Sequence, residues 1–239
     1  MTDYVCSFFR SSSFSEETVI KTLIALFELR HDFFPLILWC GSRDRLLIEK
    51  PVDFERSSIP KEYYIDSGAA RIPFEGANGT EIVFTESSVP QVAPPAFDIE
   101  FSGATSAIAS WAAADFVSLI KVVVAAFEPE YGYVADVEEI LRPEHDGVRF
   151  SIDTNRVPVS LHWINYFGPN WVRTIGDARL KRVSADVPLF EWLDTGAVLF
   201  VLQNDRFEEA NPRHVAAQKH LETLLGLKEL HREHQSNGV

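Results

Sequence analysis

Cysteine is scarce in this 239-residue chain, which holds two. Cys6 and Cys40 lie in apolar surroundings, with no histidine or second cysteine at metal-ligand spacing. We interpret both as reduced, packed thiols, because a chain of this length buries a sizeable core without a cross-link, although a single structural disulfide is the alternative. The sequence therefore predicts no metal site built on cysteine and no cofactor.

Positive charge is also scarce, with 22 lysine and arginine residues against 35 acidic residues and a formal net charge of −13. A field of this sign repels nucleic acid and anionic membranes, and it attracts basic proteins over a Debye length of about 10 Å. The plain alternative is that the acidity serves only solubility. We expect a basic protein as the partner, and no nucleic acid or membrane.

Long uninterrupted hydrophobic runs are missing. The run from 19 to 40 is broken by charged residues, and the run from 112 to 127 contains Asp115 and Lys121. The second run has only 16 residues, short of the roughly 20 apolar residues that a bilayer requires. Asp3 stands where a signal peptide would carry positive charge. The sequence predicts a cytoplasmic protein.

Enzyme signatures are missing as well, since the chain has no Gly-x-Ser-x-Gly, P-loop or His-Glu-x-x-His motif. Asp98 and Glu100 alternate along one strand face, where they could form an acid and base pair or simply meet solvent. His231, Glu233 and His234 could hold a metal, or they could be exposed in the C-terminal tail. We predict that the chain is not an enzyme and has no catalytic residue and no small-molecule substrate.

Hydrophobic residues make up 46% of the chain, which is enough for a large core. A capping box at Ser13 to Glu16 predicts a helix from about 15 to 30. The run from 110 to 127 is apolar nearly all round, which predicts a helix buried on most sides. Asn211-Pro212 opens a further helix that ends at Gly226.

Strands are predicted at 36–39, 81–85, 97–101 and 157–163, and a hairpin at 189–193 and 197–202. A short helix is expected to end at Gly176, followed by a strand or turn at 180–183. These elements predict an α+β fold, with a mixed, largely antiparallel sheet and helices packed on it. We expect one domain over 1–239, with a weakly patterned arm at about 51–95 and a flexible tail at about 228–239.

The segment from 163 to 171 holds four large aromatic residues around a Gly-Pro pair. Proline has no N–H to donate to a sheet, so pairing is expected to stop there. The segment would either pin a strand end to the next element or stack on a ligand, and we favour the structural role. The residues that we expect to specify the fold are Trp163, Asn165, Tyr166, Phe167, Gly168, Pro169 and Trp171.

Acidic residues gather between 128 and 146, where Arg142 is the one permanent cation. Carboxylates among aromatic side chains are typical of a contact surface for a basic protein, although a solvated acidic surface is the simpler alternative. The predicted contact residues are Glu128, Glu130, Tyr131, Tyr133, Asp136, Glu138, Glu139 and Asp146.

Four features follow one another in the second half of the chain: Trp163-Ile164-Asn165-Tyr166-Phe167-Gly168-Pro169, then Ile175-Gly176, then the apolar strand led by Gly196, then Ala217 to Leu221 with Leu224-Leu225-Gly226-Leu227. In this arrangement the chain resembles the immunity protein 52 family of bacterial polymorphic-toxin and type VI secretion systems. The resemblance extends from about Phe97 to Leu227.

The resemblance implies a cytoplasmic antidote in a toxin and antitoxin pair, which binds a cognate toxin and inhibits it. Members are associated with nuclease toxins of restriction-endonuclease fold, and no catalytic residues carry over. The net charge agrees, because a nuclease carries positive charge to hold phosphate. Two alternatives stay open: an adaptor or chaperone that loads an effector, and an uncharacterised hydrolase.

Overall fold

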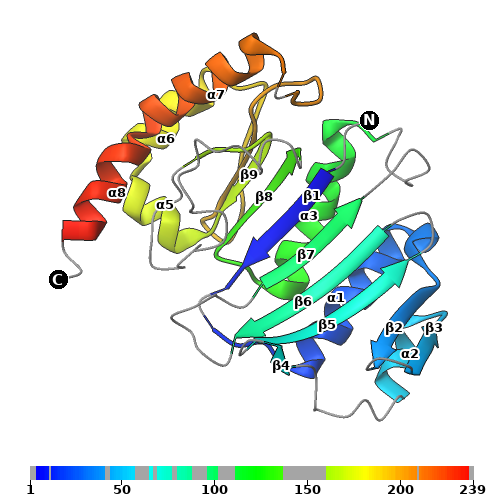
Figure 1. Ribbon diagram of the computed structural model, residues 1–239. Coiled ribbons are helices and arrows are strands. Elements are labelled where there is room, and N and C mark those ends of the chain that lie inside the picture. Colours follow the sequence, from blue (N-terminus) through cyan, green and yellow to red (C-terminus); the bar gives the residue numbers. More distant parts are fainter. Residues whose placement is uncertain are drawn as a thin grey trace.

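The computed structural model describes residues 4–10, 12–40, 44–56, 65–66, 69–76, 80–87, 96–101, 111–136, 160–208 and 210–236. Within these residues one sheet of eleven strands runs through the molecule (Figure 1). Its order is β10-β11-β9-β8-β1-β7-β6-β5-β2-β3, with β4 paired to β5. The strands are β1 Tyr4–Phe9, β2 Leu36–Cys40, β3 Asp44–Ile48, β4 Ile65–Asp66, β5 Ala69–Gly76, β6 Thr80–Ser87, β7 Ala96–Phe101, β8 Tyr131–Asp136, β9 Ile164–Phe167, β10 Leu189–Trp192 and β11 Val198–Val201.

The N-terminal strand β1 lies at the middle of this sheet, between β7 and β8. Cys6 stands opposite Ile99 on one side and opposite Val134 on the other. Both faces of β1 are covered: Tyr4, Cys6 and Phe8 belong to one hydrophobic core and Val5 to a second. A strand that is buried on both faces reads as a continuous apolar run, as this one does.

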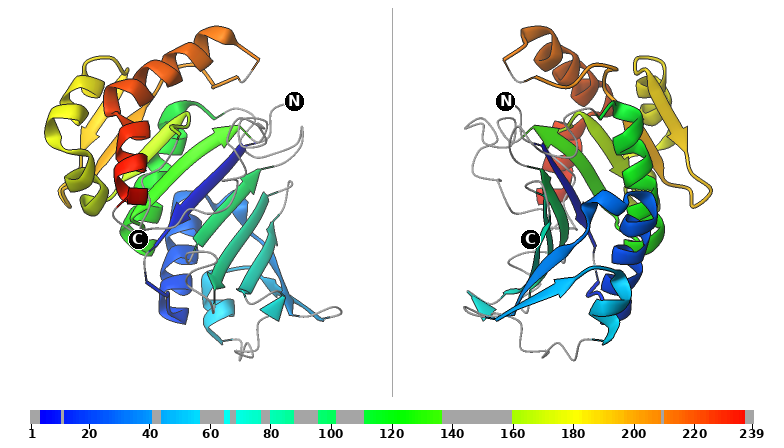
Figure 2. Two further views of the ribbon diagram at one scale, coloured as in Figure 1. Left: turned by 60° about the vertical axis from the view of Figure 1, so that its left-hand side comes forward. Right: turned by 90° about the vertical axis from the view of Figure 1, so that its right-hand side faces the viewer.

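Helices form a layer on each face of the sheet (Figure 2). Helices α1 and α3 pack together over the first core, and α5 to α8 cover the second core beside β8, β9 and β11. The helices are α1 Glu16–Leu29, α2 Pro51–Arg56, α3 Ala113–Phe127, α5 Pro169–Ile175, α6 Asp177–Ser184, α7 Pro212–Leu225 and α8 Leu227–Ser236, and a 3₁₀ turn spans His31–Phe33.

The predicted α+β fold is confirmed, with a single qualification about the sheet. Every pairing among the described strands is antiparallel, so the mixed character that we expected is not found there. Three predicted elements are confirmed: the helix at 110–127 as α3, the helix ending at Gly226 as α7, and the hairpin β10–β11. Each of these elements is determined by signals close to it in the sequence.

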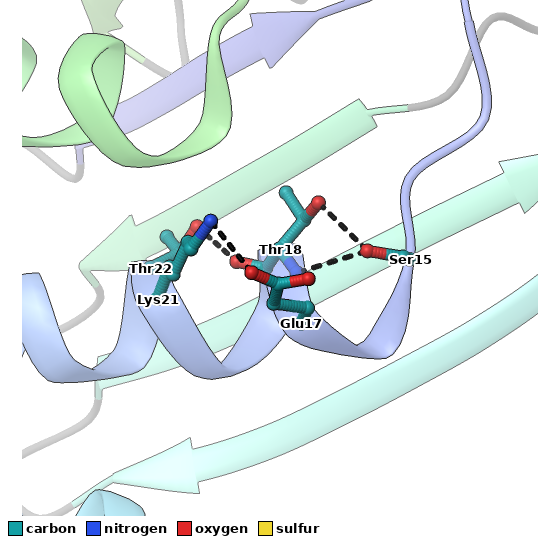
Figure 3. Close-up of polar contacts among 5 residues, drawn as sticks. All are labelled: Ser15, Glu17, Thr18, Lys21 and Thr22. Carbon is teal, nitrogen blue, oxygen red and sulfur yellow. Dashed lines mark hydrogen bonds and ion pairs between the residues drawn. The ribbon is translucent and has the colours of Figure 1, made fainter.

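Helix α1 is confirmed, but its cap differs from the prediction (Figure 3). The N-cap is Ser15, whose hydroxyl oxygen accepts a hydrogen bond from the amide of Thr18 at 3.3 Å. The predicted capping residue, Ser13, precedes the helix by two positions. One turn on, Lys21 pairs with Glu17 at 2.8 Å, and the hydroxyl of Thr22 donates to the carbonyl oxygen of Thr18 at 2.8 Å. The cap is therefore local, but the rule placed it two residues too early.

Three segments have more regular structure than the prediction. Strand β5 lies inside the expected irregular arm, and together with β6, the strand predicted at 81–85, it joins β2 to β7 in the sheet. Residues 180–183 belong to helix α6, not to a strand or turn. The expected flexible tail contains helix α8, where the side chain of Leu230 is buried in the second core. In each segment tertiary contacts supply stability that a local pattern does not reveal.

Candidate partner-binding surface

The aromatic segment from 163 to 171 lies in the interior. Trp163 is fully buried, between the rings of Tyr4 at 5.5 Å and Phe116 at 5.4 Å, and its indole N–H donates to the carbonyl oxygen of Gln203 at 3.0 Å. Phe167 is fully buried in the second core, and Tyr166 in the first. These aromatics are packed inside the protein, and the described part of the segment presents no stacking surface to a ligand.

The strand predicted at 157–163 begins later, at Ile164; residues 157–159 lie outside the described residues. Side chains bind the backbone just before it: the amide group of Asn165 accepts from His162 N at 2.9 Å and donates to His162 O at 2.6 Å. Glu222 of α7 accepts from Leu161 N at 3.0 Å, and Gln218 donates to Leu161 O. Because these bonds satisfy the backbone at 161–162, the segment does not need a neighbouring strand.

Gly168 and Pro169 form the junction between β9 and α5. The amide of Gly168 donates to the carbonyl oxygen of Glu130 at 2.8 Å, and a Cβ at this position would lie 2.8 Å from that same oxygen. Pro169 occupies the first turn of α5, where its missing N–H costs nothing, and Trp171 is buried against the second core. The junction thus requires glycine because of a close backbone approach.

The predicted acidic surface begins at the end of α3. Glu128 is exposed and has a left-handed backbone, with a φ of 53°. Glu130 is half-buried, and its amide donates to Phe9 O at 2.7 Å. Burial, helped by the negative charge of Glu130, raises the pKa of Tyr166 to about 12. A partner can therefore reach the side chain of Glu128 and part of the side chain of Glu130.

Three other predicted contact residues are buried. Tyr131, Tyr133 and Asp136 are at most 8% exposed. The ring of Tyr131 stacks between Phe9 at 6.1 Å and Phe167 at 5.5 Å. A side chain that is already buried offers little area to a partner, so the three belong to the core of β8. Glu138, Glu139 and Asp146 lie outside the described residues.

Helices α1 and α3 form a surface groove between them that the sequence did not predict. It has a volume of about 590 Å³, and it is open to solvent between the outer sides of α1 and α3. We call it the α1–α3 groove, and its lining residues are Lys21, Ile24, Ala25, Glu28, Leu29, Val122, Ala125 and Ala126. Because α3 is apolar nearly all round, we expected it to be buried on most sides, but Ala114, Ser118 and Ala125 are exposed. This apolar composition was the signal in the sequence that could have indicated the groove.

Candidate chemistry elsewhere is limited. Among the described residues there is no group of three or more histidine, cysteine, aspartate or glutamate side chains that could hold a metal ion, and no helix long and apolar enough to cross a membrane. Cys6 is a buried cysteine. The side chains of Asp98, Glu100, His231 and His234 lie outside what the structure describes.

The fold and the groove define an antiparallel α+β protein with an apolar surface groove near acidic residues. This fold is similar to that of a solved structure described as "Pseudomonas aeruginosa T6SS protein PA0821". The match has a TM-score of 0.57 and 11% sequence identity, and covers 94% of this chain and 72% of that chain. At this identity the likeness shows the fold alone.

No family model matches the sequence, and no curated protein matches it. The resemblance to the immunity protein 52 family therefore stays a prediction.

Proposed function

We propose that this chain is an immunity protein of a type VI secretion system. In this role it binds a cognate basic toxin in the cytoplasm and inhibits it, with no bond made or broken by the chain itself. The toxin class that fits best is a nuclease. The observation that carries the proposal is the fold, which is similar over 94% of this chain to that of a T6SS protein.

The net charge supports a basic toxin as the partner. A nuclease holds the phosphates of its substrate with lysine and arginine side chains, and it keeps this positive surface whether or not DNA is bound. A chain of formal charge −13 is attracted to such a surface and competes with the nucleic acid for it. Charge complementarity of this kind raises the association rate and makes it depend on salt.

The side chains at the α1–α3 groove suit contact better than catalysis. Its lining is mostly alanine, isoleucine, leucine and valine, which provide area but no nucleophile, acid or base. The two ionisable lining residues are Lys21 and Glu28, and Lys21 is already paired with Glu17. An apolar floor with few charged groups is typical of the centre of a protein interface.

The test is co-expression with the toxin encoded beside this chain in its genome. We expect the chain to restore growth of a bacterial host that makes the toxin. In vitro, an equimolar amount should stop the purified toxin from cleaving plasmid DNA. The association rate should fall about tenfold or more when salt rises from about 50 to about 200 mM. If the toxin keeps its full activity with the chain in excess, the proposal is wrong.

A second function, an adaptor that loads a secreted effector, is favoured by the same groove. An adaptor needs an exposed apolar surface that receives a segment of its cargo, and the α1–α3 groove is such a surface. The co-expression experiment separates the two functions. An adaptor would bind the toxin and promote its export but would leave the toxin active, whereas an immunity protein would restore growth.

A further inference from the structure

We propose that the α1–α3 groove receives an amphipathic helix of the partner, with an apolar stripe on the groove floor and basic residues along its flanks. This inference rests on the proposed function for the identity of the partner as a toxin. It goes beyond that function because it assigns the contact to one face of the protein and states the secondary structure and charge of the segment that binds there.

The lining has the spacing that one helix presents to another. On α1 it is Lys21, Ile24, Ala25 and Glu28, which follow at three and four residues along one side. On α3 it is Val122, Ala125 and Ala126, with the same spacing. Side chains three and four apart form the ridges that pack into the grooves of a neighbouring helix. Alanines at the centre keep the groove low enough for a third helix to approach.

The composition of α3 is not explained by the packing of this chain alone. Its charged residues are Asp115 and Lys121, and its sheet-facing side already contains Phe116, Leu119 and Val123. A helix with one side in water normally carries polar residues there. The outer side of α3 does so at Asp115, Ser118 and Lys121, but where it lines the groove it carries Val122, Ala125 and Ala126. Across the groove Ile24 of α1 is 39% exposed. This apolar stretch along the groove is the surface that we assign to the partner.

Charge decides in favour of a basic helix over a second copy of the chain. Glu17, Glu28 and Glu128 surround the groove, and the carboxylates of Glu17 and Glu128 raise the pKa of Lys21. Lys21, which pairs with Glu17, and Arg10, which lies 5.4 Å over the ring of Phe127, offset this charge only in part.

A second copy of the chain would carry the same excess of acidic residues to this face. Two copies would bring these acidic rims, and two chains of −13, together.

The experiment uses the full chain and a defined probe. The probe is a fluorescent peptide of about 18 residues, long enough to form a helix, with leucine along one face and lysine along the other. A scrambled peptide of the same composition has the same charge but no apolar face. A third peptide replaces every lysine with glutamate. Binding is measured by fluorescence anisotropy at physiological salt.

The variants separate packing from charge. Ile24→Glu and Ala125→Glu each add a carboxylate to the groove, so they would strengthen binding that is purely electrostatic and weaken binding that needs the apolar floor. Ala114→Glu is the matched control, because it lies on the same side of α3 as Ala125, three turns away and outside the lining. Circular dichroism checks that all three variants keep the wild-type fold.

We expect the amphipathic lysine peptide to bind the wild type and the Ala114→Glu variant with equal affinity. Its affinity should fall about tenfold for Ile24→Glu and for Ala125→Glu, and the scrambled and glutamate peptides should bind at least about tenfold more weakly. Equal or tighter binding to the two groove variants would overturn the inference. Equal binding of the scrambled peptide, or of the glutamate peptide, would overturn it too. A wild-type dimer in sedimentation that Ala125→Glu dissociates would show that a second copy fills the groove instead.

The same variants distinguish failure of this inference from failure of the proposed function. If the wild type restores growth against the toxin and the two groove variants restore it equally well, the function stands and the groove assignment is wrong. If the wild type does not restore growth, the immunity function is wrong, and the peptide measurements still decide whether the groove binds a basic helix.

Discussion

Replacing Gly168 with alanine should destabilise the protein, although the backbone of Gly168 suits any residue. Its φ is −65° and its ψ is 170°, which is ordinary extended backbone. The problem is space. A Cβ would lie 2.8 Å from the carbonyl oxygen of Glu130 and 3.1 Å from its Cα. Both are main-chain atoms of the segment leading into β8, so they cannot rotate away as a flexible side chain would.

The size of the effect follows from opposing terms. Alanine restricts the unfolded chain, which stabilises the folded state by about 0.4–1 kcal/mol. Relieving an overpacked contact costs about 1–3 kcal/mol. Separating β8 from the junction also lengthens the 2.8 Å hydrogen bond from Gly168 N to Glu130 O, worth about 1 kcal/mol. We expect a net loss of about 1–3 kcal/mol, which lowers the melting temperature by several degrees in a chain of this size.

Urea unfolding measures the loss, and amide hydrogen exchange tests its cause. In Gly168→Ala the amide of residue 168 should exchange faster, because its bond to Glu130 is strained. Gly176→Ala is the comparison: a Cβ there meets nothing within 4 Å, and its cost comes from a φ of +86°. That variant should lose stability without exposing the amide of residue 168. A Gly168→Ala protein as stable as the wild type, with this amide still protected, would refute the reasoning.

Three further groups of variants test the cap of α1, the half-buried carboxylate of Glu222 and the buried phenol of Tyr166. Ser15→Ala should cost about 1 kcal/mol in urea unfolding because it removes the α1 cap, whereas Ser13→Ala should cost almost nothing. Glu222→Ala should cost about 1–3 kcal/mol, since it strands the Leu161 amide, and Glu222→Gln, which keeps an acceptor, should cost less. In the folded state the pKa of Tyr166 is raised to about 12, whereas in the unfolded chain it is about 10. The neutral phenol therefore contributes fully to the free energy of unfolding below about pH 10, and this contribution is lost as pH rises to about 12. The wild type should therefore lose up to about 3 kcal/mol of unfolding free energy over that interval because of this residue. Tyr166→Phe, which has no hydroxyl to ionise, should not show this part of the loss when urea unfolding is measured at each pH.

The elements that sequence reasoning placed correctly are those whose signals are local. Asn211 caps α7 through a bond to the amide two residues ahead, Pro212 occupies its first turn, and Gly226 ends it with a φ of 68°. The β10–β11 hairpin turns at Gly196, whose φ is 80°. All these features lie within a few residues of the element that they bound. A rule that examines a short window of sequence is enough for them.

The errors occur where distant residues determine the backbone. The strand predicted to run through Leu161 and His162 does not form there, because the carboxylate of Glu222, 61 residues away from Leu161, holds that amide. Leu161 is buried in the second core and Trp163 in the first, so two apolar residues that suggested one strand face pack in different places. No property of residues 157–163 distinguishes this packing from a strand, so the error could be found only in three dimensions.

The contact surface was predicted from composition, and composition does not state which way a strand faces. In β8 successive residues point to opposite faces, and here both faces are covered, so the aromatic and acidic residues predicted as contacts at 131, 133 and 136 became core residues. Glu128 is exposed because it follows the last turn of α3 and precedes β8. The same helix pattern that indicated burial left an apolar stretch of α3 open at the groove. In our proposal this stretch, and not acidic composition alone, locates the binding surface.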